Sequence, residues 1–191
     1  MDFFKSIAVV YDYIDGQVTE LTESIALAVA TLNDTIDDEV AALTAAIDAI
    51  GFPYASRFAA YASSGQTINI TTFTKIQFGN ESYDNNSEYD KDTNYRWTAK
   101  ETGVYTFGSV IELKGIDDGK FGYAVIRKNG SVNVLYDAVT SPLIRSIFLK
   151  PYGDVALNVD DYLEVYVYHT DTGVRYTGVN EKCRFWGHRI A

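Results

Sequence analysis

The sequence predicts a mainly β protein whose compact head, a sandwich or jelly roll of about ten short strands, follows an N-terminal α-helical coiled coil. Three observations predict this fold class. Apolar residues recur every eleven positions through the first fifty residues, and short aromatic-rich runs replace that period from Tyr54 onward. The 191 residues also include 15 Tyr and 10 Phe, which favour strands. A chain of this length can bury one ordinary core, so we expect one globular domain with a helical appendage.

The eleven-residue repeat places aliphatic side chains in three registers of the first fifty residues. Three apolar positions in every eleven, spaced three, four and four apart, form a narrow stripe on a helix of about 3.67 residues per turn and predict a straight or gently right-handed supercoil. A helix packed on a globular core would show a wider apolar face. The predicted seam between parallel chains consists of Ile7, Val10, Ile14, Val18, Leu21, Ile25, Val29, Leu32, Ile36, Val40, Leu43 and Ile47.

Isoleucine at seam positions favours three or four parallel chains over two. A Gly followed by a Pro commonly ends a helix, so Gly51 and Pro53 predict the end of the stalk. Asp15 and Gly16 are the weakest point of the pattern, where a kink or a late helix start is the alternative to a continuous helix. The predicted organisation is an anchor and stalk over residues 1–50, a neck with the first strand over 51–66, and the remainder of the head over 67–191.

Alternating and aromatic-rich runs bounded by Gly, Asn and Asp predict the strands of the head. Residues 123–128 and 131–136 flank Asn129-Gly130, a pair that favours a tight hairpin turn. Residues 162–168 alternate apolar and polar side chains, as a half-buried strand does. Further strands are predicted at residues 58–61, 68–78, 103–113, 146–149, 155–157 and 185–190. Without interleaved helices, a sandwich or jelly roll is favoured over a parallel sheet.

Several blocks of the head share the pattern of one family. They are Phe73–Phe78, Tyr95–Phe107 with its Gly-Val-Tyr-Thr-Phe, Val125–Gly130, Val159–Val165 and Phe185–Ile190. Together they resemble the globular head of complement component one, subcomponent q (C1q), over roughly residues 55–191. The resemblance implies a ten-stranded jelly roll of the tumour necrosis factor (TNF) type that assembles as a tight trimer.

The chain departs from that family at two turns and in its stalk. Lys100 stands where the family usually has Pro, and Asp160 stands where a Gly-Asp turn is usual. No Gly-X-Y collagen repeat precedes the head. Three heads require three stalk helices, so the stalk and the resemblance agree on a homotrimer with a parallel trimeric coiled coil.

Negative charge is concentrated in the predicted stalk. The formal net charge is −10, and the first fifty residues contain ten acidic residues and one basic residue, Lys5. Nucleic acids and anionic membranes bind clustered Lys and Arg, so we expect neither as a partner. Asp12 and Asp15 interrupt the apolar opening segment, so we expect no signal peptide and no membrane insertion. The single cysteine, Cys183, excludes an intrachain disulfide and is expected to be a small buried hydrophobe.

No sequence motif for nucleophilic, phosphate-binding or zinc chemistry is present, so we expect no enzyme activity, no cofactor and no metal site. His169 and His188 lie in different strands or turns, and His188, beside Trp186 and Gly187, is expected to be a packed or interfacial side chain. The run Asp84–Asp92 alternates oxygen-bearing side chains as calcium loops do, but it lacks the Gly and the distal Glu of an EF-hand and is predicted to be a solvated loop. Asp117-Asp118 is predicted to be a turn; a cation between like carboxylates near a threefold axis is the alternative.

These features favour a structural, non-enzymatic fibre of a virus particle, such as a bacteriophage head or tail fibre. Such a homotrimer would be synthesised in the host cytoplasm and located in the virion. Phe3 and Phe4 would anchor it to a capsid or tail protein, and its head would attach to a host-surface glycan or receptor, or decorate the particle. Helix capping and fraying is the alternative interpretation of the opening stub.

Two other functions compete with the fibre. The first is a secreted complement-like recognition protein, which would need a leader sequence and usually carries collagen or disulfides. The second is an enzyme head such as a glycan hydrolase, for which paired carboxylates in an acidic chain are no evidence without geometry.

Overall fold

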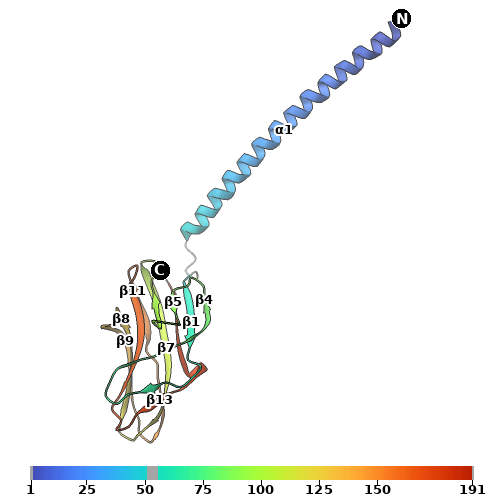
Figure 1. Ribbon diagram of the computed structural model, residues 1–191. Helices are drawn as coiled ribbons and strands as arrows, with labels where there is room; N and C mark the ends of the chain where they lie inside the picture. The colour runs from blue at the N-terminus through green and yellow to red at the C-terminus, as the bar shows by residue number, and fades with distance from the viewer. Residues whose placement is uncertain (1, 51–55, 191) are drawn as a thin grey trace. The chain divides into compact units, whose positions relative to one another are not determined.

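The computed structural model of the chain describes residues 2–50 and 56–190. The chain divides into two compact units, residues 1–52 and residues 53–191 (Figure 1). The described part of the first unit is a single helix, and that of the second is a head of two β-sheets. A long helix followed by a mainly β sandwich confirms this much of the predicted fold class.

Helix α1 runs without interruption from Asp2 to Ile50, a length of 49 residues. Gly16 lies inside it, so the alternative of a late helix start at this point is wrong. Figure 1 shows α1 as one continuous helix. The segment contains no proline and many alanines, which explains why the helix continues. The predicted stop at Gly51 and Pro53 lies outside the described residues. In the part of the chain that the structure describes, no helix is both long and apolar enough to cross a membrane.

Threonine hydroxyls on α1 bond to the helix itself. Each donates to the backbone carbonyl four residues earlier, at 2.7–2.9 Å. This bond satisfies the hydroxyl without a partner from elsewhere. The residues concerned are Thr19, Thr22, Thr31, Thr35 and Thr44.

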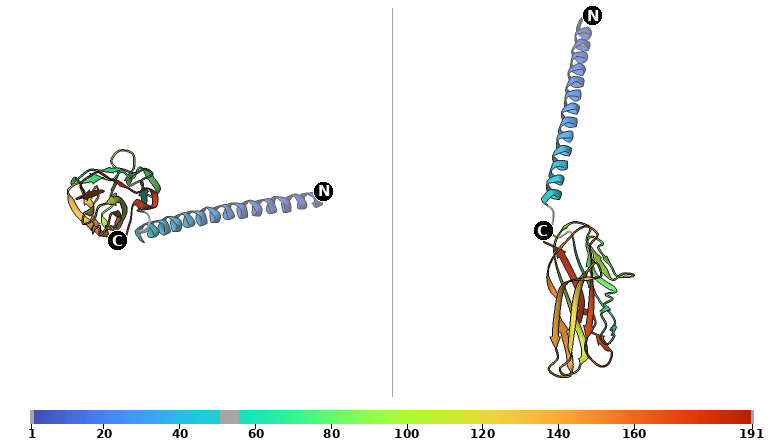
Figure 2. Two further views of the ribbon diagram at one scale, coloured as in Figure 1. Left: turned by 90° about the horizontal axis from the view of Figure 1, so that it is seen from below. Right: turned by 90° about the vertical axis from the view of Figure 1, so that its left-hand side faces the viewer.

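The described part of the head contains fourteen strands in two antiparallel sheets, which run along its length as two layers (Figure 2). Sheet A has the order β2-β13-β7-β14-β1-β4, and β10 and β11 also pair with β7. Its strands are β1 (Arg57–Tyr61), β2 (Thr67–Ile68), β4 (Asn80–Asp84), β7 (Gly103–Ile116), β10 (Arg145–Leu149), β11 (Tyr152–Leu157), β13 (Arg175–Thr177) and β14 (Cys183–Arg189). A short 3-10 helix, Asn180–Lys182, leads into β14.

Sheet B has the order β5-β6-β12-β8-β9, and β3 also pairs with β12. Its strands are β3 (Thr74–Lys75), β5 (Tyr89–Asp90), β6 (Arg96–Thr98), β8 (Phe121–Lys128), β9 (Val132–Thr140) and β12 (Tyr162–His169). The inner faces of the two sheets enclose a single core.

Two groups of strands differ from the expectation. Residues 68–78, predicted as one strand, contain only β2, a turn and β3, and Thr71 in that turn has a φ of +48°. The strands β4, β5, β6 and β13 were not predicted. They are two to five residues long and largely polar, too short for an alternating pattern to be recognised, and they form because neighbouring strands supply their hydrogen bonds.

Aromatic rings build the core between the sheets. Phe58 on β1 stacks on Tyr89 with 5.3 Å between ring centroids and meets Phe185 edge to face at 4.9 Å. Trp97 lies 4.9 Å from Phe107, also near an edge-to-face geometry. Side chains of this size bury the largest apolar areas in a core. Their contacts pack β1, β7 and β14 of sheet A against β5 and β6 of sheet B.

Cys183 is buried in the same core. Burial penalises the charged thiolate and raises the pKa of the Cys183 thiol to about 12. The prediction that this residue is a small buried hydrophobe is confirmed.

The hairpin between β8 and β9 is fastened at its turn. Asn129 and Gly130 have φ of +52° and +73°, as a type I′ turn requires, which confirms the predicted turn. Three donors reach the carboxylate of Asp161: Lys128 Nζ at 2.6 Å, Asn129 Nδ2 at 2.8 Å and the Asn158 N–H at 2.8 Å. They favour the charged carboxylate, Lys128 most strongly, and lower the pKa of Asp161 from 3.8 to about 2.

We predict that Asp161→Asn lowers the free energy of unfolding by about 1–3 kcal/mol near neutral pH, because it replaces charge-assisted bonds with neutral ones. The folded-state pKa lies below the unfolded value, so the carboxylate stabilises the fold above about pH 4, and this contribution is lost as the pH falls towards 2. Denaturant unfolding near pH 7 and near pH 2 measures both effects. Asp118→Asn, in the exposed β7–β8 turn, is the matched control. An equal loss for Asp161→Asn at both pH values would contradict the prediction.

Candidate functional site

The twelve predicted seam side chains are all exposed on α1, with exposed fractions between 36% and 62%. Their spacing places them along one side of the helix. Aliphatic side chains that stay in water over the length of a helix leave a large apolar area without a partner. The described chain therefore presents a continuous aliphatic stripe, which we call the seam.

The two predicted anchor residues stand at the start of the same helix. The side chain of Phe4 is 80% exposed. The side chain of Phe3 lies outside the part of the chain that the structure describes. The anchor assignment therefore stays a prediction.

One transverse row of residues crosses the outer surface of sheet A. The strand register aligns Tyr83, Ala59, Trp186, Gly108 and Tyr152 on β4, β1, β14, β7 and β11. The small residues in this row let the large rings lie close to the backbone, since a Cβ on Gly108 would lie 2.5 Å from Cζ2 of Trp186. Tyr83 and Tyr152 are 47% and 66% exposed. We call this row, which forms an exposed aromatic surface, the aromatic face.

A Gly108→Ala substitution tests this packing. We expect it to displace the Trp186 ring and to lower the free energy of unfolding by about 1–3 kcal/mol, because the added methyl has no room beside the ring. Tryptophan emission should shift to the red as the ring moves into water. Gly16→Ala is the matched control, since its Cβ meets no atom within 4 Å, and it should leave the emission unchanged. Unchanged emission from Gly108→Ala would show that the ring does not lie over this position.

Rings and a guanidinium group also gather on the outer surface of sheet B. The Arg127 guanidinium lies 4.2 Å from the ring centroid of Phe73 and 4.7 Å from that of Tyr166. Neighbouring rings lie 5.3–6.0 Å apart, which is the range of attractive ring pairs. This surface, the ring platform, comprises Phe73, Phe121, Tyr123, Arg127, Tyr136, Tyr166 and Tyr168.

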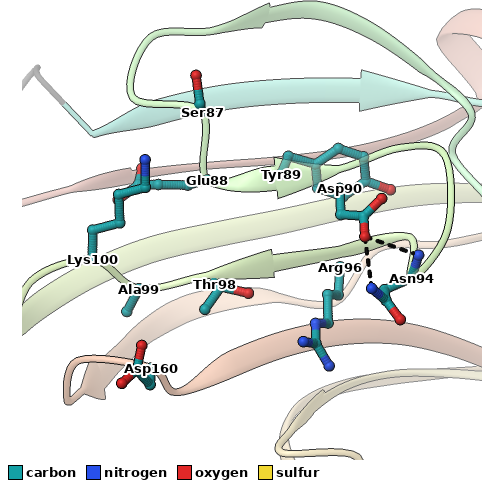
Figure 3. Close-up of a pocket in the computed structure, with 10 residues that line it drawn as sticks. All are labelled: Ser87, Glu88, Tyr89, Asp90, Asn94, Arg96, Thr98, Ala99, Lys100 and Asp160. Atoms are coloured by element: carbon teal, nitrogen blue, oxygen red, sulfur yellow. Dashed lines mark hydrogen bonds between the residues drawn. The ribbon is translucent and has the colours of Figure 1, made fainter.

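A polar pocket of about 330 Å³, which we call the end pocket, lies between the β5–β6 hairpin and the loop that follows β11 (Figure 3). Arg96 and Thr98 come from β6, and Asp160 comes from the loop. Asp90 supports the hairpin because its carboxylate accepts hydrogen bonds from the backbone N–H groups of residues 92, 93 and 94 and from Nδ2 of Asn94. These donors, the N–H of residue 93 first, lower the pKa of the Asp90 carboxyl.

The prediction of a solvated loop at Asp84–Asp92 is wrong at its centre. Glu88 and Tyr89 are only 4% and 7% exposed. The Glu88 carboxylate accepts a hydrogen bond from the Ser56 hydroxyl at 2.6 Å, and the Tyr89 hydroxyl donates to the backbone carbonyl of Phe78. Sequence reasoning missed this because Ser56 lies 32 residues before Glu88, so no local pattern reveals the pair.

The two histidines lie in different environments. His169 is completely buried; its Nε2 lies 3.1 Å from the carbonyl of Ile68, and its Nδ1 accepts the N–H of Asp171. These partners fit the tautomer with the proton on Nε2, so His169 is a packed core side chain. His188 is exposed on the outer surface of sheet A, beside the aromatic face.

Asp117 is engaged by an ion pair that the sequence did not indicate. Its carboxylate lies 3.0 Å from Nη2 of Arg175, which also contacts the buried carboxylate of Asp171 at 2.7 Å. Although burial opposes the charge on Asp171, its bonds with Arg175 and with backbone N–H groups lower the pKa of that carboxyl overall. Asp117 and Asp118 lie in the β7–β8 turn, as predicted. Among the described residues, no group of three or more His, Cys, Asp or Glu lies in a position to hold a metal ion.

Comparison with known proteins gives matches only among solved structures: no family model and no curated protein matches the chain. The globular domain of zebrafish complement 1qA protein aligns with 71% of the chain and 98% of its own length, with a TM-score of 0.54 and 14% identity. Eiger TNF from S. frugiperda aligns with 71% of the chain and 92% of its own length, with a TM-score of 0.53 and 14% identity. Murine APRIL aligns with 71% of the chain and 98% of its own length, with a TM-score of 0.54 and 10% identity.

The head is a C1q/TNF-like jelly roll. Identity this low establishes the fold alone. The two turns at which the sequence departs from the C1q pattern, at Lys100 and Asp160, form without the Pro and Gly that are usual there. Asp160, where the resemblance led us to expect a glycine turn, has a φ of +68°, a conformation that Asp tolerates better than most residues. The turn around Lys100 is held by the Asp160 N–H, which donates to the carbonyl of Ala99, and by the Ala99 N–H, which donates to that of Asp161.

Proposed function

We propose that the chain is the homotrimeric fibre protein of a virus particle, in which three α1 helices form a parallel coiled-coil stalk and three jelly rolls meet around the same axis. The observation that carries the trimeric assembly is the seam, where twelve aliphatic side chains in eleven-residue register are exposed to water. Burying the seam against two further copies removes this apolar area from water, and the period suits a straight or gently right-handed bundle.

The charge pattern of α1 supports its self-association. On a helix of about 3.67 residues per turn, the positions next to the seam on one side are Tyr11, Thr22, Asn33 and Thr44, and those on the other side are Gln17, Ala28, Glu39 and Ile50. Only Glu39 among them is charged. The remaining acidic residues lie farther from the seam, so water and salt screen their mutual repulsion in a parallel bundle.

The head supplies a second reason for three chains. The C1q/TNF resemblance implies a trimeric head, and the aromatic face is an exposed surface of the kind that marks a protein interface. Tyr and Trp are also the residues that contribute most at such interfaces. A trimer built on this face would bury Tyr152 and Trp186 near its axis.

We predict that Leu32→Asp weakens the stalk strongly, while Leu27→Asp does not. Leu32 belongs to the seam, whereas Leu27 is 71% exposed on the opposite side of the helix. The two variants therefore carry the same Leu→Asp substitution on opposite faces of α1. We expect Leu32→Asp to cost more than about 3 kcal/mol per trimer, because it buries three carboxylates at one level. Sedimentation of the full chain and the temperature dependence of its helical circular dichroism measure the effect.

The wild-type chain should sediment at three times its own mass of 21.3 kDa. A wild-type monomer or dimer would contradict the trimer. Equal effects of the two substitutions would contradict the seam. The helical circular dichroism of both variants is also measured at high dilution, where the chains are monomeric. If both lose the same amount of helix there, the destabilisation comes from the lower helix propensity of Asp and not from contacts between chains.

The fibre role rests on the combination of stalk and head. A long stalk separates a binding head from its support, and Phe3 and Phe4 at its start would anchor the fibre in a capsid or tail protein, as in a bacteriophage head or tail fibre. The head would attach to the host surface or decorate the particle. The likeness to the complement 1qA domain favours the second candidate, a secreted complement-like recognition protein.

We expect an antibody against the head to label purified particles of the virus that encodes the chain, in immunogold electron microscopy. Soluble full-length chain, added in excess, should slow adsorption of the particles to host cells, because it competes for the same surface. Phe4→Asp should reduce incorporation into particles without changing the sedimentation of the free chain. Unlabelled particles, with the chain recovered only from the extracellular fluid, would favour the secreted recognition protein.

A further inference from the structure

We propose that the end pocket binds one neutral sugar unit of a glycan. The inference deepens the attachment role proposed above and rests on it for the source of the glycan, which would be the host surface. The chemistry of the pocket can be tested separately from that role.

The pocket is preorganised by bonds within its own walls. Asp90 holds the β5–β6 turn through three backbone N–H groups, with donor–acceptor distances of 2.9–3.2 Å. The Arg96 guanidinium lies 4.3 Å from the ring centroid of Tyr162, so stacking holds it in place. Ser87 and Asp160 both have a positive φ, +52° and +68°, which places their side chains in fixed turns at the rim. A site that is already ordered loses little entropy when it binds a ligand.

Most charged groups in the pocket already have hydrogen-bond partners within the protein. Glu88 is bonded to Ser56 and to Nδ2 of Asn86, and Lys100 Nζ donates to the carbonyl of Asn86 at 2.5 Å. Asp90 is occupied by the turn. These bonds fix the walls of the pocket, and the exposed Lys100 ammonium keeps further donors for a ligand.

One cation and one anion of the pocket have no hydrogen-bond partner among the described residues. Within residues 2–50 and 56–190, neither the Arg96 guanidinium nor the Asp160 carboxylate has a hydrogen bond or an ion pair. Thr98 Oγ1 and Ser87 Oγ likewise bond to no described protein group. Figure 3 shows Arg96 and Thr98 on one strand and Asp160 on the loop beside it. The pocket thus offers donors and acceptors together, from two cationic and three anionic side chains: Arg96, Lys100, Glu88, Asp90 and Asp160.

This balance selects a polyhydroxylated neutral ligand. Each sugar hydroxyl both donates and accepts, so neighbouring hydroxyls can bond to Arg96 and to Asp160 at once. A phosphate or carboxylate would be repelled by Asp160, and a simple cation by Arg96. The volume of about 330 Å³ is at the lower end of the ~300–1,000 Å³ range of ligand pockets and suits a single sugar unit.

A longer glycan has a path out of the pocket. Tyr162 and Tyr166 lie on the same outer surface of β12, because alternate residues of a strand share a face. Tyr162, which the Arg96 guanidinium contacts, therefore lies on the same surface of sheet B as the ring platform. Exposed rings can stack against the C–H faces of further sugar units, which adds affinity without demanding one sequence of sugars.

The test uses the full-length chain on a printed glycan array, followed by saturation-transfer NMR and titration with the free hexoses and N-acetylhexosamines that terminate the bound glycans. We expect Arg96→Ala and Asp160→Gly each to raise the Kd about tenfold or more, because each removes charge-assisted hydrogen bonds. Glycine tolerates the positive φ of residue 160, so that substitution keeps the turn. Arg145→Ala and Asp118→Gly, at exposed positions outside the pocket, are the matched controls and should stay within about twofold.

Absence of binding to every glycan on the array would overturn the proposal. Binding that Tyr136→Ala abolishes and Arg96→Ala leaves intact would assign the glycan to the ring platform and overturn the pocket. A thermal melt of each variant shows whether the fold survives. Because sedimentation and particle labelling are measured independently, a chain that binds sugar but labels no particles would refute the fibre role and keep the pocket.

Discussion

Strand β7 is the constraint on which the head depends. Its residues Gly103–Ile116 pair with β10, β11, β13 and β14, so strands from distant parts of the chain take their register from it. Phe107 points from it into the core, and Gly108 lies beneath the rings of the aromatic face. One strand thus positions the interior and the surface through which the head would assemble. A shift of β7 by a single residue would exchange the two sets of side chains and lose both.

Long or chemically distinctive elements could be predicted from the sequence, and short ones could not. The eleven-residue period recurs along α1, and Asn129 and Gly130 both tolerate the positive φ that a tight hairpin turn requires. β5 and β6 contain only two and three residues, so they carry no readable period. Their existence depends on β12, which lies more than sixty residues farther along the chain and supplies the hydrogen bonds of β6.

A sequence pattern shows only residues that lie close together in one element, and this decides which candidate sites could be predicted. The exposed aliphatic stripe of α1 could be predicted because all its members lie on one helix, and its role as a seam between chains stays a prediction. The end pocket could not, because Arg96 and Asp160 are brought together only by the sandwich, and neither belongs to a motif. The abundance of Tyr and Phe predicted strands but not where their rings would gather. Several of them lie together on the outer surface of sheet B, where Arg127 contacts Phe73 and Tyr166.

The buried thiol of Cys183 makes the chain well suited to distance measurements by spectroscopy. With its pKa raised to about 12 and its side chain inside the core, this native sulfur presents almost no thiolate to a maleimide at neutral pH. A cysteine introduced at an exposed position of α1 would therefore react alone. Spin labels attached there would report the spacing and number of neighbouring copies directly, with no need to remove the native residue and disturb the interior.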